Sequence, residues 1–229
     1  MNGADIVPAS QRPVAAMILA AGRGERMRPL TDALPKPLLR VRGKPLIERH
    51  VERLAQSGIG SVVINLAWLG GMIREHLGDG SRYGISIRYS EETPRALETA
   101  GGIFRALPLL GAAPFMVVNG DILTDYPFEN LRLRGDHDAH LVLVRNPPQH
   151  MEGDFGLEAG LATAVAARRH TFSGIAVYRP EFFAGCADGV FPLKPLLLRA
   201  MAAGRCGAEL YEGAWEDVGT PERLAALNA

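Results

Sequence analysis

The sequence contains little cysteine and no excess of either charge. Its 229 residues include two cysteines, Cys186 and Cys206, which lack metal-ligand spacing and are too few for a disulfide scaffold. We expect two free, buried thiols in a reducing compartment. Lysine plus arginine and aspartate plus glutamate both number 25, so no basic excess indicates binding to nucleic acid.

Segments that would direct the chain to a membrane are also lacking. No apolar run reaches the length needed to span a bilayer. Residues 1–13 are polar and show no basic-then-apolar signal pattern. We therefore expect a cytoplasmic protein with no membrane partner, in which residues 1–13 form a flexible arm.

The composition that is present, 47% hydrophobic and 22% charged, is that of an ordinary globular protein. Strand patterns alternate with helix patterns through the first two-thirds, which predicts a parallel sheet with crossover helices. Apolar runs predict strands at 15–21, 61–65, 85–89, 115–119, 140–144, 173–178 and 215–218. Helical spacing predicts helices at 44–57, 69–77, 99–110, 193–203 and 221–227. We expect one domain, 14–229, with a hairpin at 153–165 and its last third wrapped over the sheet.

A small, basic loop follows the first predicted strand. Gly22 and Gly24 allow close approach of the backbone to a ligand and positive φ, and successive N–H groups in such a loop can form an anion-binding nest. The cations around it are Arg23, Arg26, Arg28 and Lys36. Its spacing excludes a Walker loop, and Met27 stands where a dinucleotide fingerprint needs a third glycine. The loop therefore predicts a polyphosphate site.

Residues 19–38 contain Leu-Ala-Ala-Gly-x-Gly-x-Arg-Met-x-Pro-Leu-Thr and then Pro-Lys-Pro-Leu, a pattern that resembles the signature of the sugar-1-phosphate nucleotidylyltransferases. The resemblance continues through 43–47, 97–102, 119–121 and 215–220. It implies an α/β fold of the three-layer Rossmann-like (GT-A) type, with a mixed, mostly parallel sheet and helices on both faces. It also implies a nucleotide-binding part at 14–120 and a sugar-binding part at 121–229. The partners would be a nucleoside triphosphate and a sugar 1-phosphate, bound by a monomer or small homo-oligomer.

The resemblance also implies roles for individual residues of the loop. Gly22, Arg23 and Gly24 would cradle the β- and γ-phosphates through backbone N–H groups. Arg26 and Lys36 would be catalytic, Arg26 by neutralising the leaving pyrophosphate and Lys36 by bridging the nucleotide and sugar phosphates. The residues expected to bind nucleotide are Ala21, Gly22, Arg23, Gly24, Glu25, Arg26, Lys36, Glu98, Thr99, Gly101 and Asn119.

Two aspartates are candidates for a Mg²⁺ site. Asp121 directly follows a predicted buried strand, where open α/β sheets bind ligands, although an aspartate there can also serve a turn. Asp217 lies just before the last predicted helix and could cap it, but Thr220, followed by Pro221, is the better cap. Because Mg²⁺ needs few protein carboxylates when substrate phosphates complete its shell, we expect Asp121 and Asp217 to suffice.

Selectivity for base and sugar would depend on two other segments. Residues 97–102, with two glycines at a helix start, would lie over the nucleobase. Residues 146–155 resemble the Asn-Pro…Gly-Asp-Phe segment of a narrower group, the N-acetylmuramate α-1-phosphate uridylyltransferases of bacterial cell-wall recycling. That group transfers uridylyl from UTP to N-acetylmuramate α-1-phosphate and releases pyrophosphate. Asn119 and Asp154 would then bind the sugar, with a hairpin-turn role as the alternative for Asp154.

Other interpretations stay open. The same chemistry fits a guanylyltransferase for mannose 1-phosphate or heptose 1-phosphate, or cytidylyl transfer to phosphocholine. From a different class, the chain could be a catalytically silent nucleotide-sugar sensor. Sensors of this fold usually lose catalytic loop residues, whereas Arg26, Lys36, Asp121 and Asp217 are all present here.

Overall fold

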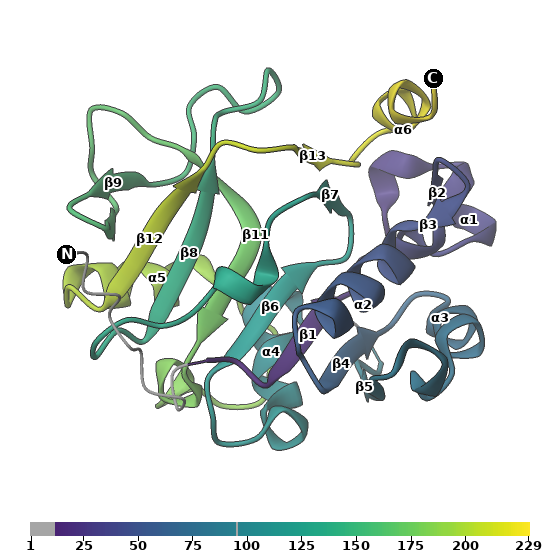
Figure 1. The fold of residues 1–229 in the computed structure, drawn as a ribbon, viewed down its shortest axis with the longest axis horizontal. Helices are drawn as coiled ribbons and strands as arrows, with labels where there is room; N and C mark the ends of the chain where they lie inside the picture. The colour runs from purple at the N-terminus through teal and green to yellow at the C-terminus, as the bar shows by residue number, and fades with distance from the viewer. Residues whose placement is uncertain (1–11, 95) are drawn as a thin grey trace.

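The computed structural model describes residues 12–94 and 96–229, so all but the last two positions of the arm expected at 1–13 lie outside the described residues. Within this part of the chain, nine strands form one sheet in the order β5-β4-β1-β6-β11-β8-β12-β10-β9 (Figure 1). Their bounds are β1 Ala15–Leu19, β4 Ser61–Leu66, β5 Ser86–Glu91, β6 Phe115–Asn119, β8 Ala139–Val144, β9 Gly156–Glu158, β10 Leu161–Thr163, β11 Thr171–Tyr178 and β12 Cys206–Tyr211. Because β10 and β11 run against the other strands, the sheet is mixed and mostly parallel, as predicted.

Smaller elements surround this sheet. Two short antiparallel pairs join β2 Arg40–Val41 to β3 Lys44–Pro45 and β7 Ile122–Thr124 to β13 Trp215–Asp217. The helices are α1 Leu30–Ala33, α2 Leu46–Gln56, α3 Gly70–Leu77, α4 Glu98–Leu110, α5 Lys194–Ala202 and α6 Pro221–Asn228. None of the helices in the described ranges is long and apolar enough to cross a membrane.

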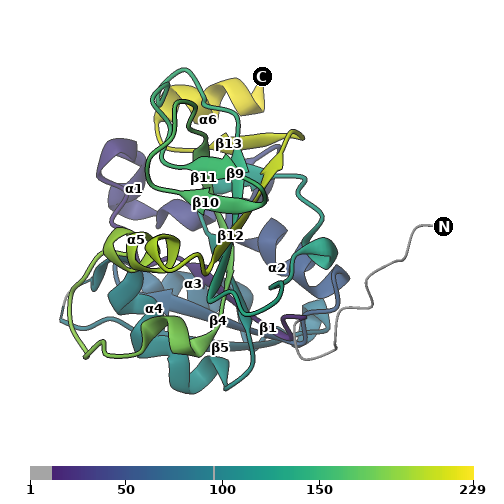
Figure 2. The same cartoon turned by 90° about the vertical axis from the view of Figure 1, so that its left-hand side faces the viewer.

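Helices cover both faces of the sheet because successive side chains of the central strand β1 point in opposite directions. Ile18 is buried in one cluster with Ile47 of α2. Met17 is buried in another, with Ile103 of α4 and Leu197 of α5. Figure 2 shows α4 and α5 on one side of the sheet and α2 on the other. The three-layer arrangement is therefore confirmed.

The expectation for the last third of the chain is wrong. Instead of wrapping over the sheet, this part extends it through β11 and β12. Strand β12 pairs in parallel with β8 although its sequence, Cys-Gly-Ala-Glu-Leu-Tyr, carries no regular alternation. Cys206 is buried at the start of β12 as expected, but Cys186 is only partly buried; both thiols are free.

Most element boundaries lie within a few residues of those predicted, and the differences have local causes. The helix expected at 44–57 begins at Leu46 because Lys44–Pro45 pair in β3. The first strand ends at Leu19, before the two alanines that precede the loop. The expected hairpin at 153–165 is present as β9 and β10.

The parallel register brings the predicted site segments to one edge of the sheet. Leu19 pairs with Asn119 at the ends of β1 and β6, and Ile18 pairs with Ile64 near the end of β4. The basic loop, the end of β4 and the turn at Asp121 therefore leave the sheet side by side. This is the edge at which parallel sheets bind ligands.

Candidate active site

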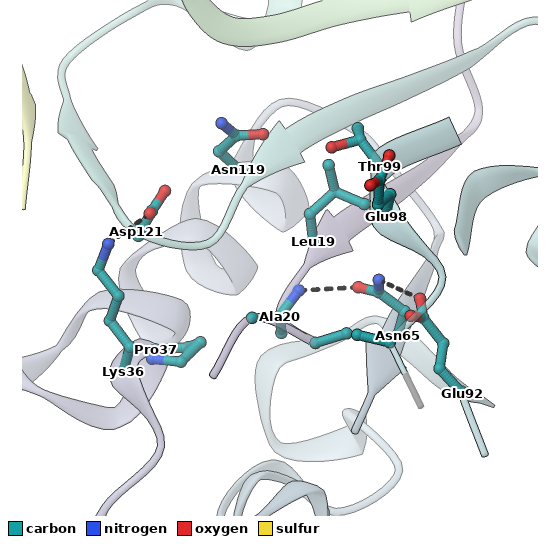
Figure 3. Close-up of a pocket in the computed structure, with 13 residues that line it drawn as sticks. Leu19, Ala20, Lys36, Pro37, Asn65, Glu92, Glu98, Thr99, Asn119 and Asp121 are labelled. Carbon is teal, nitrogen blue, oxygen red and sulfur yellow. Dashed lines mark hydrogen bonds and ion pairs between the residues drawn. The ribbon is translucent and has the colours of Figure 1, made fainter. Parts of the chain in front are cut away.

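A cavity of about 250 Å³ opens at this edge of the sheet (Figure 3). Its lining combines the end of β1, the turn after β6, the Lys36–Pro37 segment and the start of α4. The predicted site residues that line it are Ala21, Gly22, Lys36, Glu98, Thr99, Asn119 and Asp121. The fold thus brings seven of the predicted residues, from four separate segments, to one cavity.

A second cavity, of about 240 Å³, lies beside the basic loop. Gly22, Lys36 and Asp121 line both cavities, so these residues form the wall that the two share. The other predicted residues in the second cavity are Gly24, Glu25 and Arg26. Within the described part of the chain, no carboxylate pairs with Arg26, and its exposed side chain is available to an anion.

The loop takes its shape from a contact between Gly24 and Thr31. Gly24 has φ +70°, and a Cβ there would lie 3.0 Å from the Thr31 Cγ2 atom. The Thr31 hydroxyl, which is fully buried, donates to the Gly24 carbonyl at 2.9 Å. The expectation of positive φ holds for Gly24 but is wrong for Gly22, whose φ is negative or extended. Gly22 instead borders open space, since nothing lies within 4 Å of the position of an added Cβ.

The Arg23 side chain holds the loop rather than facing either cavity. Its guanidinium donates to the Thr31 carbonyl at 2.8 Å and to Asp32 at 3.0 Å, and it stacks 3.8 Å from the centre of the Trp68 ring. Arg28 also donates to Asp32, at 2.8 Å. The hydrogen bond from Arg23, and next the one from Arg28, holds the pKa of Asp32 below its ordinary value. The side chains of Arg23 and Arg28 therefore both brace the loop, and neither lines either cavity.

Lys36 and Asp121 form an ion pair at the shared wall. The Lys36 Nζ atom lies 2.5 Å from Asp121 Oδ2, and Figure 3 shows the lysine reaching across to the aspartate. The Lys36 side chain is 10% exposed, whereas that of Asp121 is 34% exposed. A cation fixed at this wall is well placed to neutralise phosphate charge, because surrounding protein strengthens its field.

The β7–β13 pair brings the backbones of the two predicted metal ligands close together. Asp217 lies opposite Ile122, and the Val218 N–H donates to the Asp121 carbonyl at 2.9 Å. The carboxylate of Asp217 reaches toward Gly219, where a Cβ would lie 2.9 Å from its Oδ2 atom, and Gly219 lines the second cavity. The Thr220 side chain accepts from Arg223 N just before α6 begins at Pro221, so the prediction that Thr220 is the cap is confirmed.

These residues fit a hard divalent cation. Both candidates are carboxylates: Asp121 lies in the turn before β7 and pairs with Lys36, whereas Asp217 ends β13, lines neither cavity and pairs with Arg223. Among residues 12–94 and 96–229, no group of three or more potential ligands could hold a metal alone. Two carboxylates would suit an ion such as Mg²⁺, which takes its remaining ligands from phosphate and water.

Sequence reasoning missed the residues that support Asp121 from behind. His50 of α2 contacts the Ile122 carbonyl at 3.0 Å, and Arg53 donates to the carbonyls of Thr124 and Tyr126. Burial lowers the pKa of His50 to about 4, so its imidazole is neutral. The sequence shows that His50 lies on the buried face of a helix, but it does not show that β7 is the partner.

The two glycines of 97–102 serve packing inside the protein. A Cβ on Gly101 would lie 2.2 Å from the Gly189 carbonyl oxygen, and Gly101 N donates to the Phe191 carbonyl at 3.2 Å. Gly101 is not in the cavity lining, whereas Glu98 and Thr99 are. Glu98 begins α4 with φ +59°, a left-handed conformation that is strained for glutamate.

The two residues predicted to bind sugar lie in different places. Asn119 lines the first cavity and packs against Gly174, where a Cβ would lie 2.4 Å from the amide nitrogen. Asp154 lines neither cavity; its Oδ2 atom accepts from Phe172 N at 2.8 Å and its Oδ1 atom lies 3.1 Å from His150 Nε2. The Asp154 carboxylate therefore joins the segment before β9 to the start of β11.

A Rossmann-like sheet with a basic glycine loop and an ion-paired aspartate at its carboxyl edge is the arrangement expected of a nucleotidyl transferase. The sequence profile of that family, described as "Nucleotidyl transferase", matches residues 15–166, so the chain belongs to it. The chain is 52% identical to the N-acetylmuramate alpha-1-phosphate uridylyltransferase of Neisseria meningitidis, over 93% of this chain and 96% of that protein. It is 36% identical to the protein of the same name from Caulobacter vibrioides, over 96% and 98%.

A solved structure has the same fold. It is described as a glucose-1-phosphate thymidylyltransferase from Bacillus anthracis and superposes with a TM-score of 0.80 at 21% sequence identity. The match covers 93% of this chain and 94% of that one. The GT-A type of Rossmann-like fold, predicted from the sequence, is therefore confirmed.

Proposed function

We propose that this chain transfers a uridylyl group from UTP to N-acetylmuramate α-1-phosphate, giving UDP-N-acetylmuramate and pyrophosphate. The observation that carries the proposal is the shared wall of Lys36 and Asp121 between two adjoining cavities. Such a wall suits a reaction in which two phosphate groups must meet at one point. Two relatives named for this activity match nearly the whole chain and support the choice of substrates.

The reaction requires positioning and charge neutralisation rather than a protein nucleophile. An oxygen of the sugar phosphate attacks the α-phosphorus of UTP. The bond from this phosphorus to the bridging oxygen of the β-phosphate breaks, and pyrophosphate leaves with the electron pair. The protein must therefore hold two mutually repelling anions in line and stabilise the leaving group.

Each part of the site has a task in this proposal. The first cavity, beside Glu98 and Thr99, takes the uracil and ribose. The backbone N–H groups at Gly22 and Gly24 hold the β- and γ-phosphates at the second cavity, and Arg26 neutralises the leaving pyrophosphate. Lys36, at the wall between the two, holds the α-phosphate against the sugar phosphate.

Asp121 and Asp217 are the residues that would hold Mg²⁺. A bound Mg²⁺ would neutralise phosphate charge and orient the reacting groups. Divalent metal ions are general in this family, and two carboxylates beside a phosphate site agree with that need. Lys36 and Arg223 keep these carboxylates compensated in the free protein.

The proposal also assigns the two substrates to different parts of the chain. Residues 14–120 supply the phosphate loop and the nucleotide cavity, and residues 121–229 supply the sugar side, with Asn119 at the junction. Asp154 remains a prediction for the sugar. Because both substrates are soluble metabolites, we propose a cytoplasmic enzyme that acts as a monomer or small homo-oligomer.

Purified protein incubated with Mg²⁺ tests the substrates. Each of the four nucleoside triphosphates is combined with N-acetylmuramate 1-phosphate, mannose 1-phosphate, heptose 1-phosphate and phosphocholine, and pyrophosphate release is measured. We expect release with UTP and N-acetylmuramate 1-phosphate. Release only with GTP and a hexose or heptose phosphate would replace this assignment by the guanylyltransferase, and no release from any pair would favour the nucleotide-sugar sensor.

A further inference from the structure

A buried amide and a buried carboxylate meet beneath the nucleotide cavity (Figure 3). Asn65 lies at the end of β4 and is 4% exposed; Glu92 follows β5 and is 2% exposed. The Asn65 Nδ2 atom donates to Glu92 Oε1 at 2.6 Å. Both residues line the cavity, and neither is among the residues predicted from the sequence.

The outer atoms of this pair bond to the two segments that face the nucleotide. Asn65 Oδ1 accepts from the backbone N–H of Ala20, where the phosphate loop begins, at 2.7 Å. Glu92 Oε2 accepts from the backbone N–H of Leu97, which immediately precedes α4, at 2.7 Å. One chain of three hydrogen bonds therefore runs from the loop expected to hold phosphates to the segment expected to hold the base.

The surrounding structure makes room for the carboxylate. A Cβ on Gly102 of α4 would lie 2.4 Å from Glu92 Oε1, so this position of the helix admits only glycine while Glu92 stays in place. Among the described residues, no cation lies within ion-pair distance of Glu92, although a buried carboxylate needs compensation. The Arg105 guanidinium interacts with Glu92 only at longer range, so the two neutral N–H donors make the direct contacts that compensate its charge.

We propose that Asn65 and Glu92 are positioning residues that set the distance between the phosphate loop and the base segment and thereby determine affinity for the nucleoside triphosphate. The inference rests on the proposed function and specifies how its nucleotide side is held. Neither residue takes part in the chemistry. The pair acts through the backbone of Ala20 and Leu97.

The order of donors and acceptors along the chain makes the inference testable. Asn65→Asp places two carboxylates face to face. Glu92→Gln places its new amide N–H against another donor, which is either the Asn65 amide N–H or the Leu97 N–H, so one hydrogen bond is lost. The double variant restores every hydrogen bond and reverses the direction of the central one alone, because the amide introduced at position 92 donates to the carboxylate introduced at position 65. The Ala20 and Leu97 N–H groups keep their acceptors in this variant.

Calorimetric binding of UTP and steady-state kinetics are measured for four proteins: the wild type, both single variants and the double variant. We expect each single variant to weaken UTP binding and raise its KM about tenfold, with the KM for the sugar phosphate within about twofold of wild type. The double variant should recover to within about threefold of wild type. Glu91→Gln, at the exposed carboxylate next to Glu92, is the matched control and should leave all constants unchanged.

Other outcomes have defined meanings. The inference would be overturned if the loss of UTP affinity in the double variant equalled the product of the losses in the two single variants. It would also be overturned if the KM values for UTP and for the sugar phosphate rose equally. If a single variant does not fold, recovery of the thermal transition and of UTP binding in the double variant supports the inference, and continued failure to fold overturns it. If the wild type binds another triphosphate instead of UTP, the proposed function fails, and the same cycle measured with that triphosphate still decides the inference.

Discussion

Lys36 and Asp121 touch each other, yet the structure predicts that their removal has different consequences for the bound metal. Asp121→Asn removes a proposed ligand, so both metal binding and turnover should be lost. Lys36→Met removes a cation that competes with the metal for the same carboxylate. In this variant turnover should be lost, while the protein binds the metal as tightly as before or more tightly.

The expected effect on stability follows from the exposure of the two partners. Breaking a buried ion pair costs about 3–5 kcal/mol and breaking an exposed one at most about 1 kcal/mol. Because Lys36 is 10% exposed and Asp121 34% exposed, Asp121→Asn should lower the free energy of unfolding by about 1–2 kcal/mol. Lys36→Met should cost less, since water can solvate the partly exposed carboxylate that remains.

Mn²⁺ binding, followed by electron paramagnetic resonance without nucleotide, separates the two roles, and urea titration gives the stabilities. We expect turnover in both variants to fall at least about 100-fold. Glu216→Gln, at an exposed carboxylate next to Asp217, is the control and should match the wild type. The reasoning is refuted if Lys36→Met loses Mn²⁺ as completely as Asp121→Asn, or if Asp121→Asn keeps its turnover.

Burial lowers the pKa of His50 from 6.5 to about 4, so below pH 6.5 the unfolded state binds more protons than the folded state. The free energy of unfolding should therefore fall by about 3 kcal/mol between pH 6.5 and pH 4. Urea titrations of His50→Gln should lack this part of the pH dependence. Burial raises the pKa of Cys206 to about 12, so a thiol reagent at pH 8 should modify only Cys186 until the protein unfolds; two fast thiols would contradict this. Glu98→Gly should raise the free energy of unfolding by about 1 kcal/mol by relieving the left-handed φ, and an unchanged thermal midpoint would count against that strain.

The features that local sequence determines were predictable. Unbroken apolar runs identified β1, β4 and β6, and the parallel alternation placed their carboxyl ends at one edge of the sheet. That geometry alone predicts that the basic loop and Asp121 meet, and the ion pair between Lys36 and Asp121 agrees with it. Strand β12 was missed because its pairing with β8 depends on contacts distant in sequence.

The choice of partners for polar side chains was not predictable. Arg23 and Arg26 are the same residue type in one loop, but Asp32 and Trp68 contact the Arg23 side chain, and only the folded loop shows this. Glycine at 101 was interpreted as room for a base, whereas the group that approaches it is the Gly189 carbonyl. In each case the sequence identified a residue able to make a close contact, and the tertiary structure decided with what.

The pairing of β7 with β13 has a consequence for the protein during its synthesis. The ribosome delivers Asp121 long before Asp217, and only the later strand brings the second carboxylate beside the first. Helix α6 then secures that strand, through Asn228, to the backbone of Arg40 and Arg42. A nascent chain that already has the phosphate loop and the central strands would still lack the second carboxylate of the proposed metal site. In the proposed mechanism, such a chain would therefore stay inactive until β13 and α6 are in place.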